Sequence, residues 1–197
     1  MANRLLLARH AETALTRDGR FIGVTDLPLS AAGREQARAL ARIVAAHAPA
    51  RVLASPLRRC RETVELATGN TCLPVEYLAD LREIDFGAWE GLTFAEIVAR
   101  DPELVNQWAV WAADFSFPGG EGLGQFQARI ETVAANLRAR PEETLLVVAH
   151  GGVIRALLCH LLHLAPRNYL LFEIKPARLS VVELYNEGGV LAALNLE

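Results

Sequence analysis

Short, almost wholly apolar runs alternate along the chain with longer segments in which apolar residues recur every three or four positions. Arg4–Ala8 is such a run and a polar break follows it directly, which predicts a buried strand. Thr144–Ala149 is the strongest strand prediction. Five more segments have strand-like composition, with a turn at Asn186–Gly189 between the last two: Arg51–Ala54, Leu73–Tyr77, Leu170–Ile174, Leu179–Leu184 and Val190–Leu194.

Helical spacing predicts the amphipathic segments between these strands. Ser30 is placed to cap a helix over Ala31–His47. Ser55-Pro56 opens the next helix, because proline is well accommodated in a first turn. Further helices are expected at Thr93–Arg100, Pro102–Ala112, Glu121–Arg140 and Val153–Leu164.

Alternating strands and helices predict an α/β fold. We expect a three-layer sandwich: a mainly parallel, doubly wound sheet, an antiparallel edge strand from the tail, and helices on both faces. The chain length of 197 residues suits one domain over residues 1–197, with a cap-like insertion at about 86–124.

Composition narrows the function. The chain is 52% hydrophobic and 22% charged, as in ordinary globular proteins. Its net charge of -3 argues against nucleic acid or an anionic membrane as the main partner, although a local arginine cluster can still bind a small anion. The apolar stretch Thr144–Ala165 is interrupted by one arginine and three histidines, so we reject a membrane-spanning helix. Three cysteines without a CxxC pair predict reduced thiols in a cytoplasmic protein.

Two histidines occupy matching positions. His10 follows the first predicted strand and His150 follows the strand at Thr144–Ala149. Ligands of open parallel sheets bind beyond the carboxyl ends of the strands, so both histidines are expected to face one pocket. Gly151 and Gly152 then allow an anion to approach the amides of a helix start.

A metal site is not predicted. Neither His10 nor His150 lies in an HxxxH or HExxH motif. His160 and His163 are three residues apart on a predicted helix, but their apolar neighbours favour ordinary helix residues.

Five blocks resemble the histidine phosphatase (phosphoglycerate mutase-like) superfamily, and they occur in the family order. The blocks are RHAET (9–13), GVTDLPLS (23–30), SPLRRCRET (55–63), LREIDFGAWEG (81–91) and AHGGVIR (149–155). The family usually has glycine where this chain has Ala11, and a positive φ there would strain the loop.

The resemblance implies a role for each matching residue. His10 matches the nucleophile that becomes phosphohistidine, and Glu83 matches the proton donor. Arg9 and Arg59 match phosphate-binding arginines, and His150 matches the second histidine, which binds the phosphoryl group. We also predict substrate contacts at Thr16, Ile22, Gly23 and Gly151.

Within the family, FGAWEG (86–91) and PGGE (118–121) look most like α-ribazole phosphatases, which act on α-ribazole 5′-phosphate in cobalamin synthesis. The alternative function is that of a broad-specificity or fructose-2,6-bisphosphatase-like sugar phosphatase. A mutase is disfavoured because Glu90–Asp101 holds a single base, Arg100. A phospho-ligand binding protein without catalysis is the remaining alternative.

The expected partner is a small phosphorylated metabolite, and no cofactor is expected. A homodimer is compatible with the sequence. Four aromatic residues are candidates either for stacking on a substrate ring or for packing in the core: Trp89, Trp108, Trp111 and Phe117.

Overall fold

A computed structural model describes residues 2–69, 71–112 and 114–197. Within these ranges six strands form one sheet in the order β3-β2-β4-β1-β5-β6. The strands are β1 (Arg4–Arg9), β2 (Arg51–Ala54), β3 (Val75–Tyr77), β4 (Thr144–Ala149), β5 (Leu179–Tyr185) and β6 (Gly188–Leu196).

The sheet is parallel from β3 to β1 and antiparallel at β5 and β6. The predicted antiparallel edge is therefore confirmed, as a hairpin of two strands rather than one. In β1, Leu5 and Leu7 face one apolar cluster while Leu6 and Ala8 face another. A strand covered on both faces needs apolar residues throughout, which explains the unbroken apolar run.

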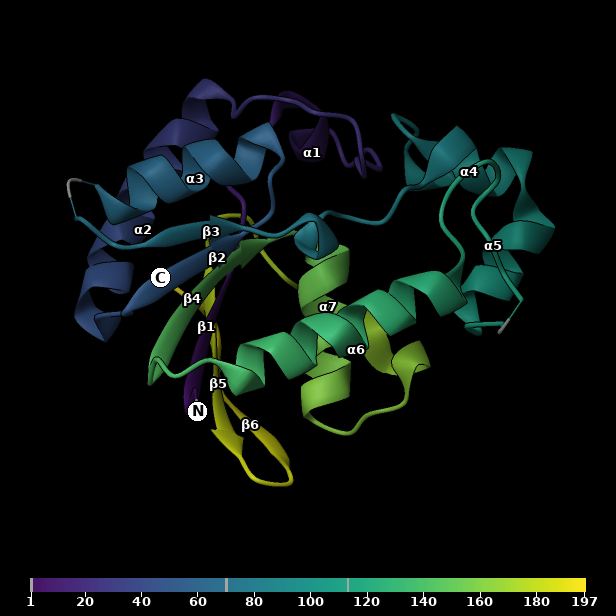
Figure 1. Ribbon diagram of the computed structural model, residues 1–197. Helices are drawn as coiled ribbons and strands as arrows, with labels where there is room; N and C mark the ends of the chain where they lie inside the picture. The colour runs from purple at the N-terminus through teal and green to yellow at the C-terminus, as the bar shows by residue number, and fades with distance from the viewer. Residues whose placement is uncertain (1, 70, 113) are drawn as a thin grey trace.

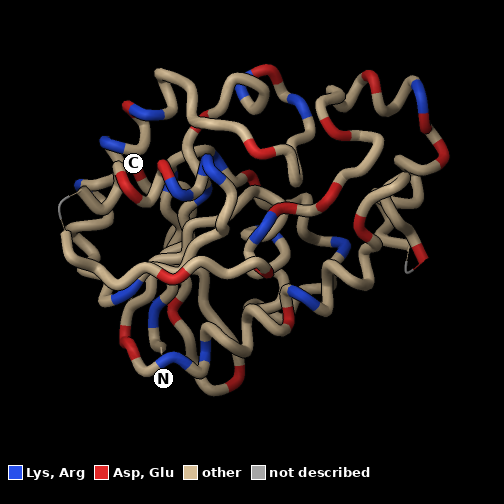
Figure 2. The backbone as a smooth tube through the Cα atoms, turned by 45° about the horizontal axis from the view of Figure 1, so that its top comes forward, with Lys and Arg blue, Asp and Glu red and all other residues tan. Residues whose placement is uncertain are grey.

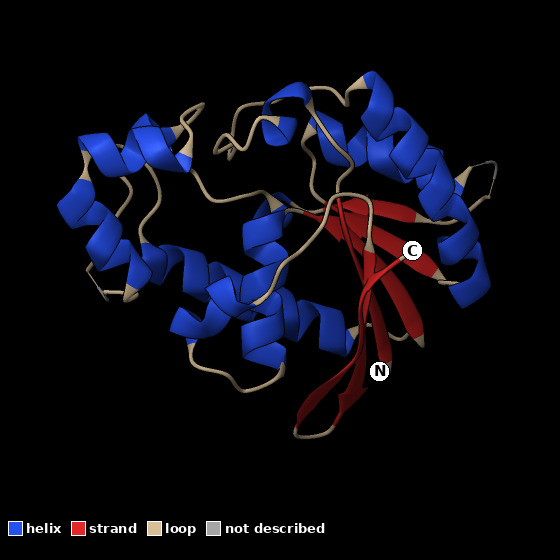
Figure 3. Cartoon of the chain, turned by 180° about the vertical axis from the view of Figure 1, so that it is seen from behind, coloured by secondary structure: helices blue, strands red, loops and turns tan. Residues whose placement is uncertain are grey.

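Helices cover both faces of the sheet (Figures 1 and 3). α2 (Ala31–His47) and α3 (Arg58–Thr68) pack on one face, and α6 (Leu123–Ala139) and α7 (Gly151–Leu161) on the other. The predicted three-layer α/β fold is confirmed. The remaining helical elements are α1 (Ala14–Arg17), α4 (Phe94–Arg100), α5 (Pro102–Ala109) and the 3-10 turns η1 (Ala79–Leu81), η2 (Gly87–Trp89) and η3 (Pro166–Leu171).

The start of α2 follows the predicted capping pattern. Ser30 Oγ accepts a hydrogen bond from the Gly33 amide at 2.9 Å. A Cβ at Gly33 would lie 2.0 Å from the Glu12 carbonyl oxygen, so only glycine allows the loop after β1 to lie this close.

Two predictions differ from the structure. The helix after β2 begins at Arg58 instead of Ser55-Pro56, because the Ser55 side chain contacts His150 rather than capping a helix. The strand predicted at Leu170–Ile174 is wrong. This segment begins within η3, and β5 already occupies the free edge of β1.

The segment that carries α4 and α5 stands away from the sheet (Figure 1). Its two ends meet: the Ala88 amide donates to the Pro118 carbonyl at 2.7 Å, and the Glu121 amide to the Asp85 carbonyl at 2.9 Å. Gly87 has φ +53°, and a Cβ there would lie 2.2 Å from the Pro118 oxygen. That this segment acts as a cap stays a prediction. None of the helices in the described ranges is long and apolar enough to cross a membrane.

Candidate active site

His10 lies at the carboxyl end of β1 and is 2% exposed. Its Nδ1 lies 2.8 Å from the Ala11 carbonyl oxygen. A carbonyl can only accept, so Nδ1 carries the proton and the neutral ring keeps a lone pair on Nε2. Burial, and then the positive charges of Arg59 and Arg9, hold the pKa of His10 well below 6.5. The ring is therefore neutral and nucleophilic at neutral pH.

His150 lies beside His10 because β1 and β4 are parallel neighbours with Arg9 opposite Ala149. The two ring centroids are 5.1 Å apart. Arg59 Nε donates to His150 Nδ1 at 3.2 Å, so the neutral ring carries its proton on Nε2, which lies 2.8 Å from Ser55 Oγ. Burial, followed by the charge of Arg59, also lowers the pKa of His150 well below its ordinary value.

Arg59 is fully buried and its guanidinium is largely engaged. It donates to the Gly23 carbonyl at 2.7 Å and to the Thr25 carbonyl at 2.8 Å, in addition to His150. Burial lowers its pKa. Arg59 thus fixes the loop that follows β1, and this loop supplies Ile22 to the cavity described below.

Arg9 approaches the same site from the end of β1. Its Nη1 donates to the Ile174 carbonyl at 2.6 Å, while Nε is buried and has no hydrogen-bond partner among the residues that the structure describes. Burial lowers its pKa to about 10, so the group is still cationic at neutral pH. A buried donor without a partner at this place is suited to an anionic ligand.

Glu83 reaches the site from the loop between η1 and η2 and is 7% exposed. One carboxylate oxygen accepts from the Gly152 amide at 2.9 Å and the other from the Ile84 amide at 3.1 Å. A Cβ at Gly152 would lie 2.6 Å from Glu83 Oε1. The second glycine after His150 therefore makes room for the acid.

A cavity of about 320 Å³ brings these groups together. Six predicted residues line it: Arg9, His10, Thr16, Ile22, Glu83 and Gly151. Three other predicted residues do not line it: Gly23, Arg59 and His150. Basic and acidic positions are interspersed over the whole chain (Figure 2). The excess of arginines over acidic residues in the lining is therefore a local property of this cavity.

Ala11 fits without strain. Its φ is not positive, its amide donates to Thr63 Oγ1 at 3.0 Å, and its methyl group packs with Leu29, Ala37 and Ala177. A glycine is therefore not required at this position of the loop.

Cys60 lies 3.5 Å from His150 Nε2, an arrangement that can serve nucleophilic catalysis. Burial raises the pKa of its thiol to about 12, and the residue does not line the cavity. The thiol is therefore protonated and out of reach of a substrate.

Within the described ranges, no cluster of three or more metal-ligating side chains occurs. His160 lies on α7, whereas His163 lies beyond the end of that helix with φ 55°.

Residues 5–197 match the sequence profile of the histidine phosphatase superfamily (branch 1). The chain belongs to this superfamily.

Several of its relatives are named phosphatases. The chain is 30% identical over 196 residues to the adenosylcobalamin/alpha-ribazole phosphatase of Escherichia coli, covering 98% of this chain and 95% of that protein. It is 35% identical over 180 residues to the glucosyl-3-phosphoglycerate phosphatase of Mycobacterium tuberculosis, covering 85% and 79%. The crystal structure of a putative alpha-ribazole-5'-P phosphatase from Escherichia coli matches with a TM-score of 0.89 at 30% identity, over 100% of this chain and 97% of that one. The chain spans about half (51%) of the length of other curated relatives, mycobacterial proteins with 36% identity over 188 residues.

Seven residues of the cavity wall are not among the predicted site residues. They come from the loop before residue 23, from the loop between η1 and η2, from α7 and from η3: Gly19, Arg20, Phe21, Ile84, Phe86, Arg155 and Tyr169. Of the four aromatic candidates, Trp89 and Phe117 are buried in the core and Trp108 lines the cavity. Trp111 lines a different cavity.

The two buried histidines predict that the stability of the protein depends on pH. Their pKa values are below 6.5 in the folded chain and return to 6.5 on unfolding, so below pH 6.5 the unfolded chain binds more protons. The contribution of the two neutral histidines to the free energy of unfolding is therefore complete above pH 6.5. Below pH 6.5 the free energy of unfolding decreases by up to about 1.4 kcal/mol per pH unit for each histidine. Urea unfolding between about pH 7.5 and 5.5 measures this, and His150→Gln should reduce the slope. A free energy of unfolding that stays constant over this range contradicts neutral, buried histidines.

Proposed function

We propose that this histidine phosphatase hydrolyses small phosphate monoesters through a phosphohistidine formed on His10. The observation that carries the proposal is the hydrogen bond from His10 Nδ1 to the Ala11 carbonyl, which leaves Nε2 as a free nucleophile. This atom belongs to a side chain that lines the same cavity as Arg9 and Glu83.

In the first step, the His10 Nε2 lone pair attacks phosphorus and the bond from phosphorus to the ester oxygen breaks. Glu83, in its protonated form, gives its proton to the departing alkoxide. The phosphorylated ring is cationic, and the Ala11 carbonyl stabilises its Nδ1 proton. Arg9 and the amide end of α7 stabilise the negative charge on the phosphoryl oxygens.

In the second step, water attacks the phosphohistidine and the P–N bond returns its electron pair to Nε2. The Glu83 carboxylate now takes a proton from the water, which restores both groups. Arg59 does not line the cavity, and it donates to the carbonyls of Ile22, Gly23 and Thr25, so its role includes holding the loop that carries Ile22.

For the substrate, we propose α-ribazole 5′-phosphate. Support comes from the Escherichia coli relative, which matches nearly full length, and from the cavity wall. Four aromatic side chains contribute to that wall, and such surfaces favour a leaving alcohol that carries a flat ring: Phe21, Phe86, Trp108 and Tyr169.

A second candidate is an ester with a carboxylate close to its phosphate, as the name of the Mycobacterium tuberculosis relative describes. Arg155 favours it. This arginine lines the cavity and uses Nε on the Phe172 carbonyl at 2.7 Å, which leaves its outer nitrogens available for a second anion.

Hydrolysis of a matched panel separates these candidates: α-ribazole 5′-phosphate, glucosyl-3-phosphoglycerate, phosphoserine and p-nitrophenyl phosphate. α-Ribazole 5′-phosphate should have the highest kcat/KM, and the Arg155→Met substitution should change this kcat/KM by less than about threefold. If a phosphate ester that carries a carboxylate has the highest kcat/KM, and Arg155→Met lowers that kcat/KM about tenfold or more, the second candidate is the substrate and α-ribazole 5′-phosphate is not. Transfer of phosphate to an added alcohol faster than release to water would instead indicate a mutase.

A further inference from the structure

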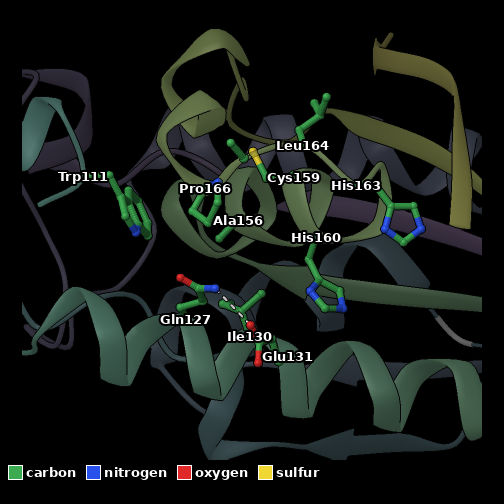
Figure 4. A pocket seen from close by; sticks show the side chains of 11 residues that line it. Trp111, Gln127, Ile130, Glu131, Ala156, Cys159, His160, His163, Leu164 and Pro166 are labelled. Carbon is green, nitrogen blue, oxygen red and sulfur yellow. Dashed lines mark hydrogen bonds between the residues drawn. The ribbon is translucent and has the colours of Figure 1, made fainter. Parts of the chain in front are cut away.

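A second cavity of about 310 Å³ lies between α6, the end of α7 and the turn that follows α7 (Figure 4). It shares no lining residue with the cavity around His10. Most of its wall is apolar, and the apolar lining residues are Trp111, Ile130, Ala156, Cys159, Leu164, Ala165 and Pro166.

Trp111 stands at one end of this cavity (Figure 4). Its φ of 57° places a bulky side chain in the left-handed region, which costs free energy and persists only where the surroundings hold it. Its ring packs edge-on against Tyr169 at a centroid distance of 4.8 Å. The indole therefore has a fixed position and offers an aromatic surface to a ligand.

Glu131 supplies the charge of this cavity. It is the one aspartate, glutamate, lysine or arginine among the lining residues, all of which lie within the described ranges and include His160 and His163. Its Oε1 accepts from Gln127 Nε2 at 3.0 Å (Figure 4), and Glu131 makes no salt bridge within those ranges. An exposed carboxylate oxygen therefore stands next to an apolar, aromatic cavity.

We infer that this second cavity binds a flat aromatic cation. The ring packs on Trp111 and the apolar floor, where an indole also attracts positive charge. The cationic end pairs with Glu131, and a planar amidinium or guanidinium group matches the carboxylate geometry. This binding site is separate from the phosphate chemistry and goes beyond the proposed function.

Benzamidine is a suitable probe, because it is flat, aromatic and monocationic. Titration of the full chain, followed by calorimetry and by amide chemical shifts, should show saturable binding with shifts at α6 and at Trp111. Benzoate, with the same ring and the opposite charge, should bind at least about tenfold more weakly. Saturating inorganic phosphate should not displace benzamidine.

Glu131→Gln keeps the shape of the exposed side chain and removes the charge. It should weaken benzamidine binding about tenfold. Glu65→Gln makes the same change on an exposed position of α3 and should leave binding unchanged. Equal binding to the Glu131→Gln variant, equal affinity for benzoate, absence of binding, or displacement by phosphate would each overturn the inference.

Discussion

Replacing His10 with alanine should reduce kcat for any good phosphomonoester substrate by about 100,000-fold, because the nucleophile itself is lost. The cavity, Arg9 and Glu83 stay in place, so binding is expected to suffer much less than turnover. The matching direct measurement is a brief pulse of ³²P-labelled substrate. The wild-type chain should carry phosphate that is stable in alkali and labile in acid on His10, and the variant should carry none.

The His10→Ala result needs a matched histidine control. His47 lies at the end of α2, away from the cavity, and His47→Ala should keep wild-type turnover. Circular dichroism and inorganic phosphate binding establish that His10→Ala is folded. A folded His10→Ala variant that turns over substrate at the wild-type rate would rule out the phosphohistidine route.

Changing Glu83 to glutamine should have the second largest effect, and its size should depend on the leaving group. An alkyl alkoxide needs a proton as it departs, so kcat for an alkyl phosphate should fall about 1,000-fold. p-Nitrophenolate departs without a proton, so the first step should continue. Water attack still needs the base, and p-nitrophenol should therefore appear as a rapid burst of one equivalent followed by slow turnover.

Stopped-flow absorbance on p-nitrophenyl phosphate measures this burst. Asp85→Asn is the control, because Asp85 accepts from the Gly87 amide and does not line the active cavity. It should behave like wild type. If Glu83→Gln lowers alkyl and aryl hydrolysis by the same factor without a burst, Glu83 is not the proton donor.

The sequence is enough to expect His10 and His150 beside each other, because strand order and register determine their positions. His10 and His150 each end an apolar strand, and the parallel pairing of β1 with β4 aligns the two ends. Glu83 lies on a loop, where the sequence offers it together with Asp85 as a candidate acid, and the family resemblance selects Glu83 as the proton donor. The structure adds the reason for its position, which is the pair of amides at Ile84 and Gly152.

The walls of the site could not be predicted, because they depend on how distant segments pack. Trp108 and Tyr169 are far apart in the sequence and lie together only after α5 folds against η3. The sequence directly after Tyr169, Leu170–Ile174, even predicts a strand. Likewise, nothing in the sequence indicates that Arg59 donates to loop carbonyls, since those bonds depend on the path of the chain after His10.

The backbone at Gly87 lies close to the Pro118 carbonyl, and this close approach has a consequence for how the specificity of related proteins can change. The segment that carries α4 and α5 leaves and returns through one point, closed by bonds between Ala88 and Pro118 and between Asp85 and Glu121. A segment of another length can replace it with little change in the entropy of closing the loop and without moving Glu83 or α6. We expect substrate preference to depend in part on this segment, because it supplies Trp108 to the cavity wall. A chimaera that receives the segment from a relative should shift toward the donor's preference while keeping the recipient's chemistry.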